Sequence, residues 1–297
     1  MNRIISMGSV NRDLLFFVPR ITRPGETIHS TTSACGIGGK GANQAVAAAR
    51  SGAATWFAGR CGSDGGEIAE VLTKQGVDCT HLHIGSGRTG EAVIQITPEG
   101  ENAIVLIPGE NFCFDKEHII SVLDCFGPGD TIMLQNEITR VPYIMEQAHR
   151  RGLRILFNPA PCTPETAQYP LEIAHTIVLN EGEARMLIPD GPSDPSALIG
   201  GIASRCPEGT VVITLGERGS LWMHAGKVHS VDAVRVDAVD TTCAGDTFIG
   251  FYAGSLARGY PAAEALSVAS RAAAVCATRI GGIAAIPTWE EVKRHAC

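Results

Sequence analysis

Short apolar segments alternate with segments of helical periodicity along most of this 297-residue chain. The apolar segments lack the polar alternation of a half-exposed strand, which suits strands buried on both faces of a parallel sheet. We therefore expect an α/β fold, a three-layer α/β/α sandwich with a mostly parallel central sheet. The expected strands lie at 3–10, 55–60, 131–134, 154–157, 176–179 and 210–215, with helical patterns such as 141–151 and 181–187 between them.

Two stretches depart from this alternation and predict a second, smaller β-sheet. Residues 14–35 contain turn residues and then alternating Thr, Ser and Ile, which indicates exposed strand rather than a crossover helix. Residues 89–107 contain two apolar runs separated by a turn at 98–102, the pattern of a β-hairpin. We expect these segments, about 12–36 and 88–110, to form a small sheet within one domain spanning 1–297. Such a sheet has a face to bury, so it covers a ligand or pairs with another subunit.

Composition excludes several classes of protein. With 44% hydrophobic and 19% charged residues, the chain can bury a large core. Its formal net charge of −7 argues against a nucleic-acid or anionic-membrane surface, and no apolar run approaches the roughly 20 residues of a membrane span. The ten cysteines are scattered, form no C-x-x-C pair and follow no signal peptide, so we expect reduced thiols and a cytoplasmic location. The nine histidines are dispersed and indicate no metal cluster.

The most informative local segment is residues 240–248, DTTCAGDTF, which leads directly into a helical pattern. That pattern predicts a helix starting at or near Ala244. The first turn of a helix has unpaired amide N–H groups, and the small residues Cys243, Ala244 and Gly245 allow an anion to approach them. Asp246, in the same turn, can accept a proton from a hydroxyl that attacks a phosphoryl group. On local sequence alone, a plain helix N-cap explains the segment equally well.

Polar residues follow several of the expected strands, at the edge where open α/β sheets bind their ligands. Asn11 and Asp13 come after the first strand and are candidates for binding sugar-like hydroxyls, although an Asx turn closing the strand is the more common use of such residues. Similar groups follow three later strands, at 135–137, 158–161 and 180–183. We expect all of them to share one edge of the sheet.

A glycine-rich run at 36–44 matches the G-x-G-x-x-G pattern only formally. It follows the polar excursion instead of the first strand, so it is not a dinucleotide-binding fingerprint. It is not a Walker A loop either, because Gly41 stands where Ser or Thr would follow Lys40. We expect the glycines to let a helix start approach a small polyol, with Lys40 and Asn43 supplying hydrogen bonds. The alternative is a helix lead-in with a solvated lysine.

Residues 214–219, TLGERG, close the last expected strand with two glycines that admit a flat or phosphorylated ligand. A hairpin joining 221–223 to 228–231 explains the glycines equally well. Residues 262–278 then form an alanine-rich helical segment whose small side chains permit tight packing.

Together these motifs resemble those of the PfkB carbohydrate kinase family, and within it the ribokinases, along essentially the whole chain. The segments that carry the resemblance are 11–13, 24–27, 38–45, 158–161, 180–183, 214–216 and 240–248. Several motifs in the family's order are more specific than any one of them alone. The resemblance implies ATP-dependent phosphorylation of the primary hydroxyl of D-ribose to ribose 5-phosphate. A kinase for another small sugar, such as deoxyribose or fructose, is the alternative; a non-catalytic sugar- or nucleotide-binding protein is disfavoured by the intact Asp246.

The resemblance also implies a role for each matching residue. Asp246 is the base that takes the sugar's proton, and the amides of 243–246 (Cys243, Ala244, Gly245 and Asp246) stabilise charge on the transferred phosphoryl group. The implied sugar contacts are Asn11, Asp13, Gly38, Gly39, Lys40, Asn43, Glu137 and Asp246. The implied nucleotide contacts are Asn180, Glu183, Thr214, Gly216, Gly219, Gly245 and Ser270, with Asn180 and Glu183 also linked to Mg²⁺ and phosphate.

A monovalent cation, K⁺, is implied beside the anion hole, held largely by backbone carbonyls at Asp240, Thr242, Cys276, Arg279 and Gly281. The implied partners are ATP with Mg²⁺ and a sugar, and the small sheet is implied to serve as a lid and as the contact of a homodimer. The chain departs from its relatives at four positions: Cys243 replaces the usual Gly or Ala, Ala285 a frequent Ser, and Glu91 and Glu110 small or apolar residues near the hairpin. We expect the two glutamates to alter sugar preference.

Overall fold

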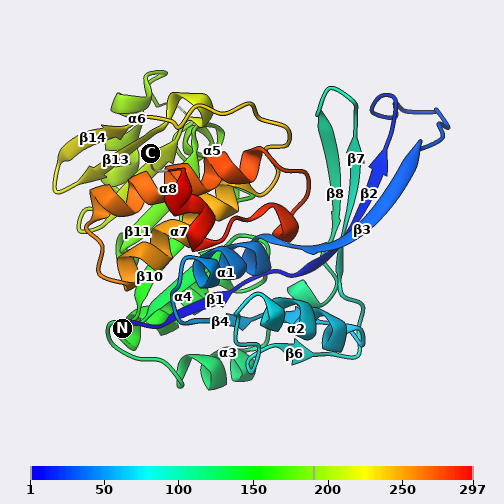
Figure 1. The fold of residues 1–297 in the computed structure, drawn as a ribbon. Helices are drawn as coiled ribbons and strands as arrows, with labels where there is room; N and C mark the ends of the chain where they lie inside the picture. Colours follow the sequence, from blue (N-terminus) through cyan, green and yellow to red (C-terminus); the bar gives the residue numbers. More distant parts are fainter. Residues whose placement is uncertain (1, 190, 296–297) are drawn as a thin grey trace.

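The computed structural model describes residues 2–189 and 191–295 and contains a central eight-stranded sheet (Figure 1). Its strands are β1 (Ile4–Met7), β4 (Thr55–Ala58), β9 (Thr131–Gln135), β10 (Arg154–Asn158), β11 (Thr176–Asn180), β12 (Thr210–Thr214), β13 (Ser220–His224) and β14 (Lys227–Val231). They lie in the order β14-β13-β12-β11-β10-β9-β1-β4. The strands from β12 to β4 are parallel to their neighbours, whereas β13 and β14 are antiparallel. The predicted mostly parallel sheet is confirmed.

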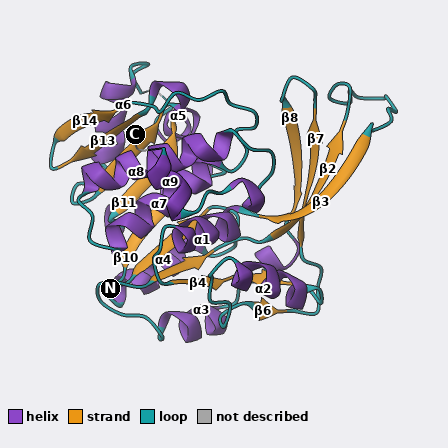
Figure 2. Ribbon diagram, in the orientation of Figure 1, coloured by secondary structure: helices purple, strands orange, loops and turns teal. Residues whose placement is uncertain are grey.

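Helices cover both faces of this sheet (Figure 2). One face packs against α1 (Lys40–Arg50), α2 (Gly65–Lys74), α7 (Ala244–Ala257), α8 (Ala262–Ala277) and α9 (Trp289–Arg294), and the other against α3 (Lys116–Leu123), α4 (Val141–Arg150), α5 (Glu181–Leu187) and α6 (Pro195–Ala203). Strand side chains alternate between the two cores: Leu156 packs on one side, and its neighbours Ile155 and Phe157 pack on the other. The expected three-layer sandwich is therefore present. In the described part of the chain, no helix has the length and apolar character needed to cross a bilayer.

Helix α7 begins at Ala244, as predicted, and packs closely against α1. A Cβ on Gly250 would lie 2.4 Å from the Cβ of Ala47, and one on Gly254 would lie 1.9 Å from the Oγ of Ser51. Only glycine permits this approach. The close packing brings the N-terminus of α7 to the first turn of α1.

A second sheet of four strands stands beside the main layers (Figure 1). Its strands are β2 (Asn11–Phe17), β3 (Thr32–Gly38), β7 (Gly90–Ile96) and β8 (Asn102–Ile107), in the order β3-β2-β7-β8. The expected β-hairpin is the antiparallel pair β7–β8. The Asx turn considered for residues 11–13 is absent: Asn11 opens β2 instead, because it pairs with Gly38 of β3 and Gly90 of β7.

Short elements lie between the longer ones. Strands β5 (Arg60–Cys61) and β6 (His83–Ile84) form a two-stranded parallel pair. The 3-10 helix η1 (Gly109–Phe112) leads from β8 back to the main body, and η4 (Gly216–Arg218) follows β12.

Candidate active site

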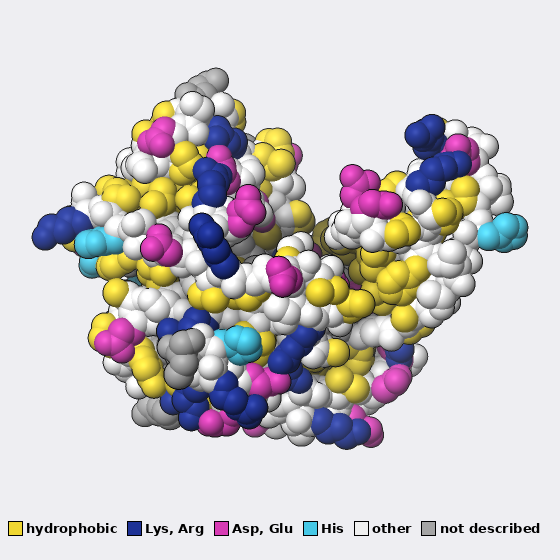
Figure 3. Space-filling view, turned by 45° about the horizontal axis from the view of Figure 1, so that its top comes forward, with side chains coloured by type: hydrophobic (Ala, Val, Ile, Leu, Met, Phe, Trp, Pro, Cys, Tyr) yellow, Lys and Arg dark blue, Asp and Glu magenta, His cyan; other side chains and the backbone are white. Residues whose placement is uncertain are grey.

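A cavity of about 210 Å³ lies at the carboxyl edge of the central sheet, facing the N-terminus of α7. Asn158, Asn180 and Thr214, the last residues of β10, β11 and β12, line it together, so polar groups from separate strand ends do share one edge. Seven residues proposed from the sequence line this cavity: Lys40, Asn180, Glu183, Thr214, Cys243, Gly245 and Asp246. The molecular surface is deeply hollowed between the main body and the small sheet (Figure 3).

The turn before α7 directs backbone amides toward the cavity. Cys243 is the N-cap residue and has a left-handed backbone, with φ of 66°. The Ala244 amide donates to the Thr241 carbonyl at 3.2 Å, so it is already paired in this structure, and its expected contribution to the anion hole stays a prediction. Among the residues that the structure describes, the Gly245 and Asp246 amides have no backbone acceptor. These two remain available to an anion.

Two side-chain amides of α1 hold the Asp246 carboxylate. Asn43 Nδ2 donates to Oδ2 at 3.1 Å, and Gln44 Nε2 donates to Oδ1 at 3.0 Å. Gln44 also contacts Asn158 Oδ1 at 3.2 Å and accepts a hydrogen bond from Gln135 at 2.7 Å. A buried chain of amides therefore orients Asp246. Sequence reasoning proposed Asn43 but missed Gln44, whose only signal was its place beside Asn43 in the glycine-rich run.

An acidic group surrounds Lys40 on the side of the small sheet. Glu137 Oε2 accepts hydrogen bonds from the Ser9 hydroxyl at 2.5 Å and from the Lys40 amide at 3.2 Å. Burial, followed by the charges of Glu137 and Asp246, raises the pKa of Asp13 to about 7. Burial also raises the pKa of Glu137, while the Asp246 carboxylate raises the pKa of Lys40. The lysine therefore remains charged among three acids.

Glycines make room for this acidic group. A Cβ on Gly38 would lie 2.1 Å from Asp13 Oδ2, so only glycine leaves space for the carboxylate. Gly39 is the N-cap of α1 with φ of 92°, and a Cβ there would lie 2.8 Å from the Cα of Val10. Asn11 is buried, and its Oδ1 accepts a hydrogen bond from Asn111 Nδ2 at 2.8 Å. The NH₂ group of Asn11 is left to donate elsewhere.

Asn180 and Glu183 form a capping box at the start of α5. The Glu183 amide donates to Asn180 Oδ1 at 2.8 Å, and the Asn180 amide donates to Glu183 Oε2 at 2.9 Å. Burial raises the pKa of Glu183, which lines the cavity. This element therefore has a structural role in addition to any role toward a ligand.

Three residues proposed as nucleotide contacts do not line the cavity formed by the described residues: Gly216, Gly219 and Ser270. Gly219 directly precedes β13, and a Cβ there would lie 2.1 Å from the Val231 carbonyl oxygen, so the close approach of β14 accounts for this glycine. The hairpin considered for residues 214–231 is confirmed.

Asp240 joins the two loops that were expected to hold a monovalent cation. Its carboxylate accepts the Thr242 amide at 2.8 Å and the Gly281 amide at 3.0 Å. Cys276 Sγ lies 3.9 Å from the Thr242 carbonyl oxygen, and the Arg279 guanidinium pairs with a glutamate of α9 at 2.6 Å. Residues 2–189 and 191–295 contain no cluster of three His, Cys, Asp or Glu side chains suited to a metal. A cation in these loops would therefore bind backbone carbonyls, and Mg²⁺ would depend mainly on phosphate oxygens and water.

Glu91 and Glu110, the two glutamates near the hairpin that depart from the family pattern, take part in ion pairs. Glu91 pairs with Arg88 at 2.8 Å on the surface. Glu110 is buried and pairs with Arg60 at 3.2 Å. The Glu110 carboxylate is therefore occupied inside the protein, and the expectation that Glu91 and Glu110 alter sugar preference stays a prediction. Ala285 is buried in a short 3-10 turn, Ile283–Ala285.

Comparison with known proteins places these features in a family context. The model of pfkB family carbohydrate kinases matches residues 1–289. The chain is 34% identical over 292 residues to the ribokinase of Haemophilus influenzae, covering 96% of this chain and 95% of that protein. The ribokinase of Cryptococcus neoformans in complex with ADP superposes with a TM-score of 0.86 at 32% identity, covering 99% of both chains. Arabidopsis thaliana ribokinase complexed with ribose and ATP superposes with a TM-score of 0.84 at 26% identity, covering 99% of this chain and 98% of that one.

Proposed function

The chain belongs to the pfkB family of carbohydrate kinases, and we propose that it transfers the γ-phosphoryl group of ATP to the primary hydroxyl of D-ribose, giving ribose 5-phosphate and ADP. One observation carries the proposal. Asp246 lies in the first turn of α7, next to a free backbone amide, and it lines the cavity at the ends of β10 to β12 together with Lys40, whose own amide donates to Glu137 at 3.2 Å.

In the proposed reaction, Asp246 takes the proton of the sugar hydroxyl as its oxygen attacks the γ-phosphorus. The bond from that phosphorus to the β,γ-bridging oxygen breaks, and ADP leaves. The amides of Gly245 and Asp246 donate to the phosphoryl oxygens as negative charge builds on them, and the charged Lys40 lies on the same side. Asn43 and Gln44 each bond one carboxylate oxygen of Asp246, which leaves further acceptor capacity for the proton.

The sugar is held on the other side of Asp246. Asn11 donates to a sugar oxygen through its free NH₂ group, and Asp13 and Glu137 accept hydrogen bonds from sugar hydroxyls. Together with Asp246, these residues place three acids and an amide around the ligand, which suits a hydroxyl-rich molecule. Gly38 and Gly39 allow the sugar to approach the backbone at the start of α1.

Metal ions complete the proposal. Asn180 and Glu183 would hold Mg²⁺ through its water ligands, and the ion would supply charge neutralisation of the phosphates. Backbone carbonyls of the two loops that Asp240 joins would hold K⁺, which would supply positive charge near the start of α7. Thr214 contacts the nucleotide at the end of β12. Gly216, Gly219 and Ser270 lie outside the cavity and are proposed to contact the part of the nucleotide that extends beyond it.

The small sheet is proposed as a lid and as the contact between two subunits, in a single functional unit spanning 1–297. Its edge strand β8 exposes a continuous apolar run: Ile104, Val105, Leu106 and Ile107. An exposed apolar edge strand is a template for pairing with another chain. The proposed compartment is the cytoplasm, which suits the unpaired thiols of the nine described cysteines.

The test is phosphoryl transfer by the purified full-length chain with ATP and a panel of ribose, 2-deoxyribose, fructose and 5-deoxyribose. We expect the highest kcat/KM with ribose and no transfer to 5-deoxyribose, which lacks the acceptor hydroxyl. Asp246→Ala should lower kcat by about 10³-fold or more, as expected for loss of a general base in a preorganised site. Asp124→Ala, which removes an exposed aspartate of the outer helices, is the control. Faster turnover of another sugar would refute the substrate, and an active Asp246→Ala enzyme would refute the mechanism.

A further inference from the structure

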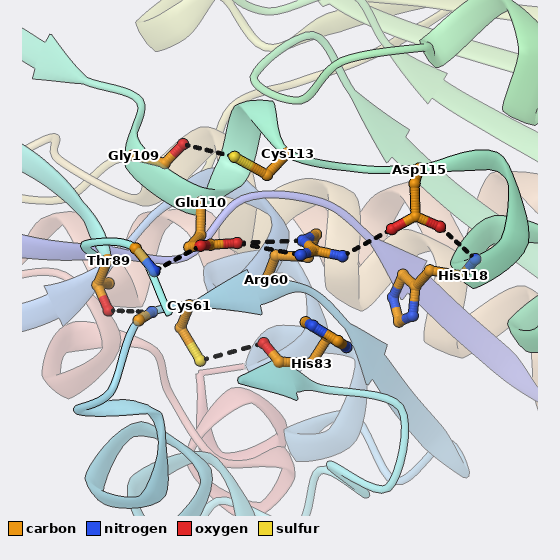
Figure 4. Close-up of polar contacts among 11 residues, drawn as sticks. Arg60, Cys61, His83, Thr89, Gly109, Glu110, Cys113, Asp115 and His118 are labelled. Carbon is orange, nitrogen blue, oxygen red and sulfur yellow. Dashed lines mark hydrogen bonds and ion pairs between the residues drawn. The ribbon is translucent and has the colours of Figure 1, made fainter. Parts of the chain in front are cut away.

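A buried ion pair joins the main body to the root of the small sheet, by which we mean η1 (Gly109–Phe112) directly after β8 (Figure 4). Glu110 of η1 is 5% exposed, and Arg60 of β5 is 8% exposed. Glu110 Oε2 accepts hydrogen bonds from both Nε and Nη2 of Arg60, each at 3.2 Å. Arg60 Nη1 also donates to Asp115, the N-cap of α3, at 3.0 Å. The arginine therefore ties η1 to two elements of the main body.

Glu110 also fastens both ends of the β7–β8 hairpin to each other. Its Oε1 accepts the Gly87 amide at 2.8 Å, and its own amide donates to the Arg88 carbonyl at 2.9 Å. Gly87 and Arg88 precede β7, whereas Glu110 follows β8. A Cβ on Gly85 or Gly87 would lie 2.4 or 2.5 Å from the carboxylate, so the backbone forms a slot that fits this group.

The next residue, Asn111, extends this connection to Asn11. It is 2% exposed, and its Oδ1 accepts the Val10 amide at 3.0 Å. Its Nδ2 donates to the Val10 carbonyl at 3.1 Å and to Asn11 Oδ1 at 2.8 Å. A Cβ on Gly90 would lie 2.2 Å from Asn111 Nδ2 and 2.4 Å from Asn11 Oδ1, so the two side chains pack tightly against this glycine. Asn111 therefore decides which end of the Asn11 amide faces the site.

We propose that Glu110 is a positioning residue for the sugar: held by Arg60, it fixes η1, and through Asn111 it keeps the NH₂ group of Asn11 directed at a sugar oxygen. This inference rests on the proposed function, in which Asn11 binds the sugar. Glu110 touches neither the Asp246 network nor the cavity at the ends of β10 to β12. Loss of its charge should therefore weaken sugar binding and leave nucleotide binding and the chemical step unchanged.

The test compares Glu110→Gln with a matched control, Asp130→Asn. Both replace a buried carboxylate that pairs with an arginine by the amide of equal size, and Asp130 pairs with Arg3 at the opposite edge of the sheet. For Glu110→Gln we expect a rise of about five- to tenfold in the KM for ribose, with kcat and the KM for ATP within about twofold of wild type. Asp130→Asn should leave all three constants within about twofold, whatever its effect on Tm.

Asn111→Asp tests the connection directly. The aspartate still accepts the Val10 amide but no longer donates to Asn11, so we expect a larger rise in the KM for ribose than in Glu110→Gln. Equal sugar KM values in Glu110→Gln and Asp130→Asn, or parallel changes in kcat and both KM values, would overturn the inference. If the wild type prefers another sugar, the proposed substrate fails and the same comparison is made with the preferred sugar; turnover of no sugar would refute both proposals.

Discussion

The two sides of Asp246 are built differently. On the proposed sugar side, charged and amide side chains bond one another: Glu137 with Ser9, Asn43 with Asp246, and Asn111 with Asn11. On the proposed nucleotide side, the cavity is lined by free backbone amides, short side chains and a capping box that belongs to α5. The first side depends on particular side chains, whereas the second depends on backbone geometry.

This difference follows from what each side has to recognise. A sugar presents hydroxyls in a fixed arrangement, and only oriented side chains discriminate among such arrangements. A phosphate presents equivalent oxygens, and the start of any helix already supplies donors for them. Substitutions should therefore cost most around the amides that orient Asp246, less at the individual sugar contacts, and least at the side chains of the anion hole.

Among the residues around Asp246, the largest effect is expected from Gln44→Met, which removes one of the two amides that orient the carboxylate. Methionine has a similar length but cannot donate to Oδ1 of the carboxylate or accept from Gln135. Since small errors in the placement of a catalytic group cost about 10²-fold, we expect kcat to fall by about that factor with the KM for ribose within about threefold. Steady-state kinetics measure both constants.

Gln147→Met is the matched control for this variant. Gln147 is also a buried glutamine, but it lies on α4 and bonds Arg151, remote from the cavity. It should keep the wild-type kcat even if Tm falls. An equal loss of kcat in both variants would mean that Gln44 acts only through stability. It would contradict the view that the amide network orients Asp246 for catalysis.

Gln44 also shows the limit of what can be predicted from the sequence alone. The start of α7 at Ala244 and the shared edge of the polar strand ends were predicted correctly, because helix starts and buried strands are set by neighbouring residues. Gln44 contacts Asp246 across 202 positions of the chain. No local pattern encodes a pairing over that distance, so its role became visible only once α1 and α7 were placed together.

Two other features could not be predicted locally, for related reasons. Residues 11–13 were open to interpretation as a turn, since a strand that pairs with β7 cannot be recognised without β7. Burial of the Glu110 carboxylate could not be predicted locally, because it depends on an arginine 50 positions earlier. Both concern the small sheet and its root, where contacts between distant segments decide the structure.

A smaller effect is expected at a single sugar contact, Asp13→Asn. The pKa of Asp13 is about 7, raised by burial and by Glu137 and Asp246, so the carboxyl is protonated below that pH. Only the ionised form accepts hydrogen bonds with both oxygens. The wild-type kcat/KM for ribose should therefore rise from pH 6 to pH 8 with an apparent pKa near 7, while Asp13→Asn shows about tenfold lower kcat/KM at pH 8 and no such rise.

The same shift has a consequence for stability. The folded pKa of about 7 exceeds the unfolded value of 3.8, so the stabilising contribution of the protonated carboxyl is complete below 3.8 and is lost as pH rises through 7. Asp13→Asn carries no such charge and should be more stable than wild type at pH 8, by an amount on the order of a few kcal/mol. Thermal unfolding at pH 5 and pH 8 measures this; a variant less stable than wild type at pH 8 would contradict the origin of the shift in burial.

The smallest effect is expected from Cys243→Ala, on the nucleotide side. The neighbouring Cys276 thiol and then burial raise the pKa of Cys243 well above its ordinary value, so the side chain is a neutral thiol at pH 7. Its N-cap position makes no side-chain hydrogen bond to the helix, and alanine accepts the left-handed φ of 66° no less well than cysteine does. The Gly245 and Asp246 amides should stay in place, and kcat and the KM for ATP should remain within about threefold of wild type. A tenfold loss would show that the thiol itself contacts the phosphoryl group, and the anion hole would then depend on a particular side chain as the sugar side does.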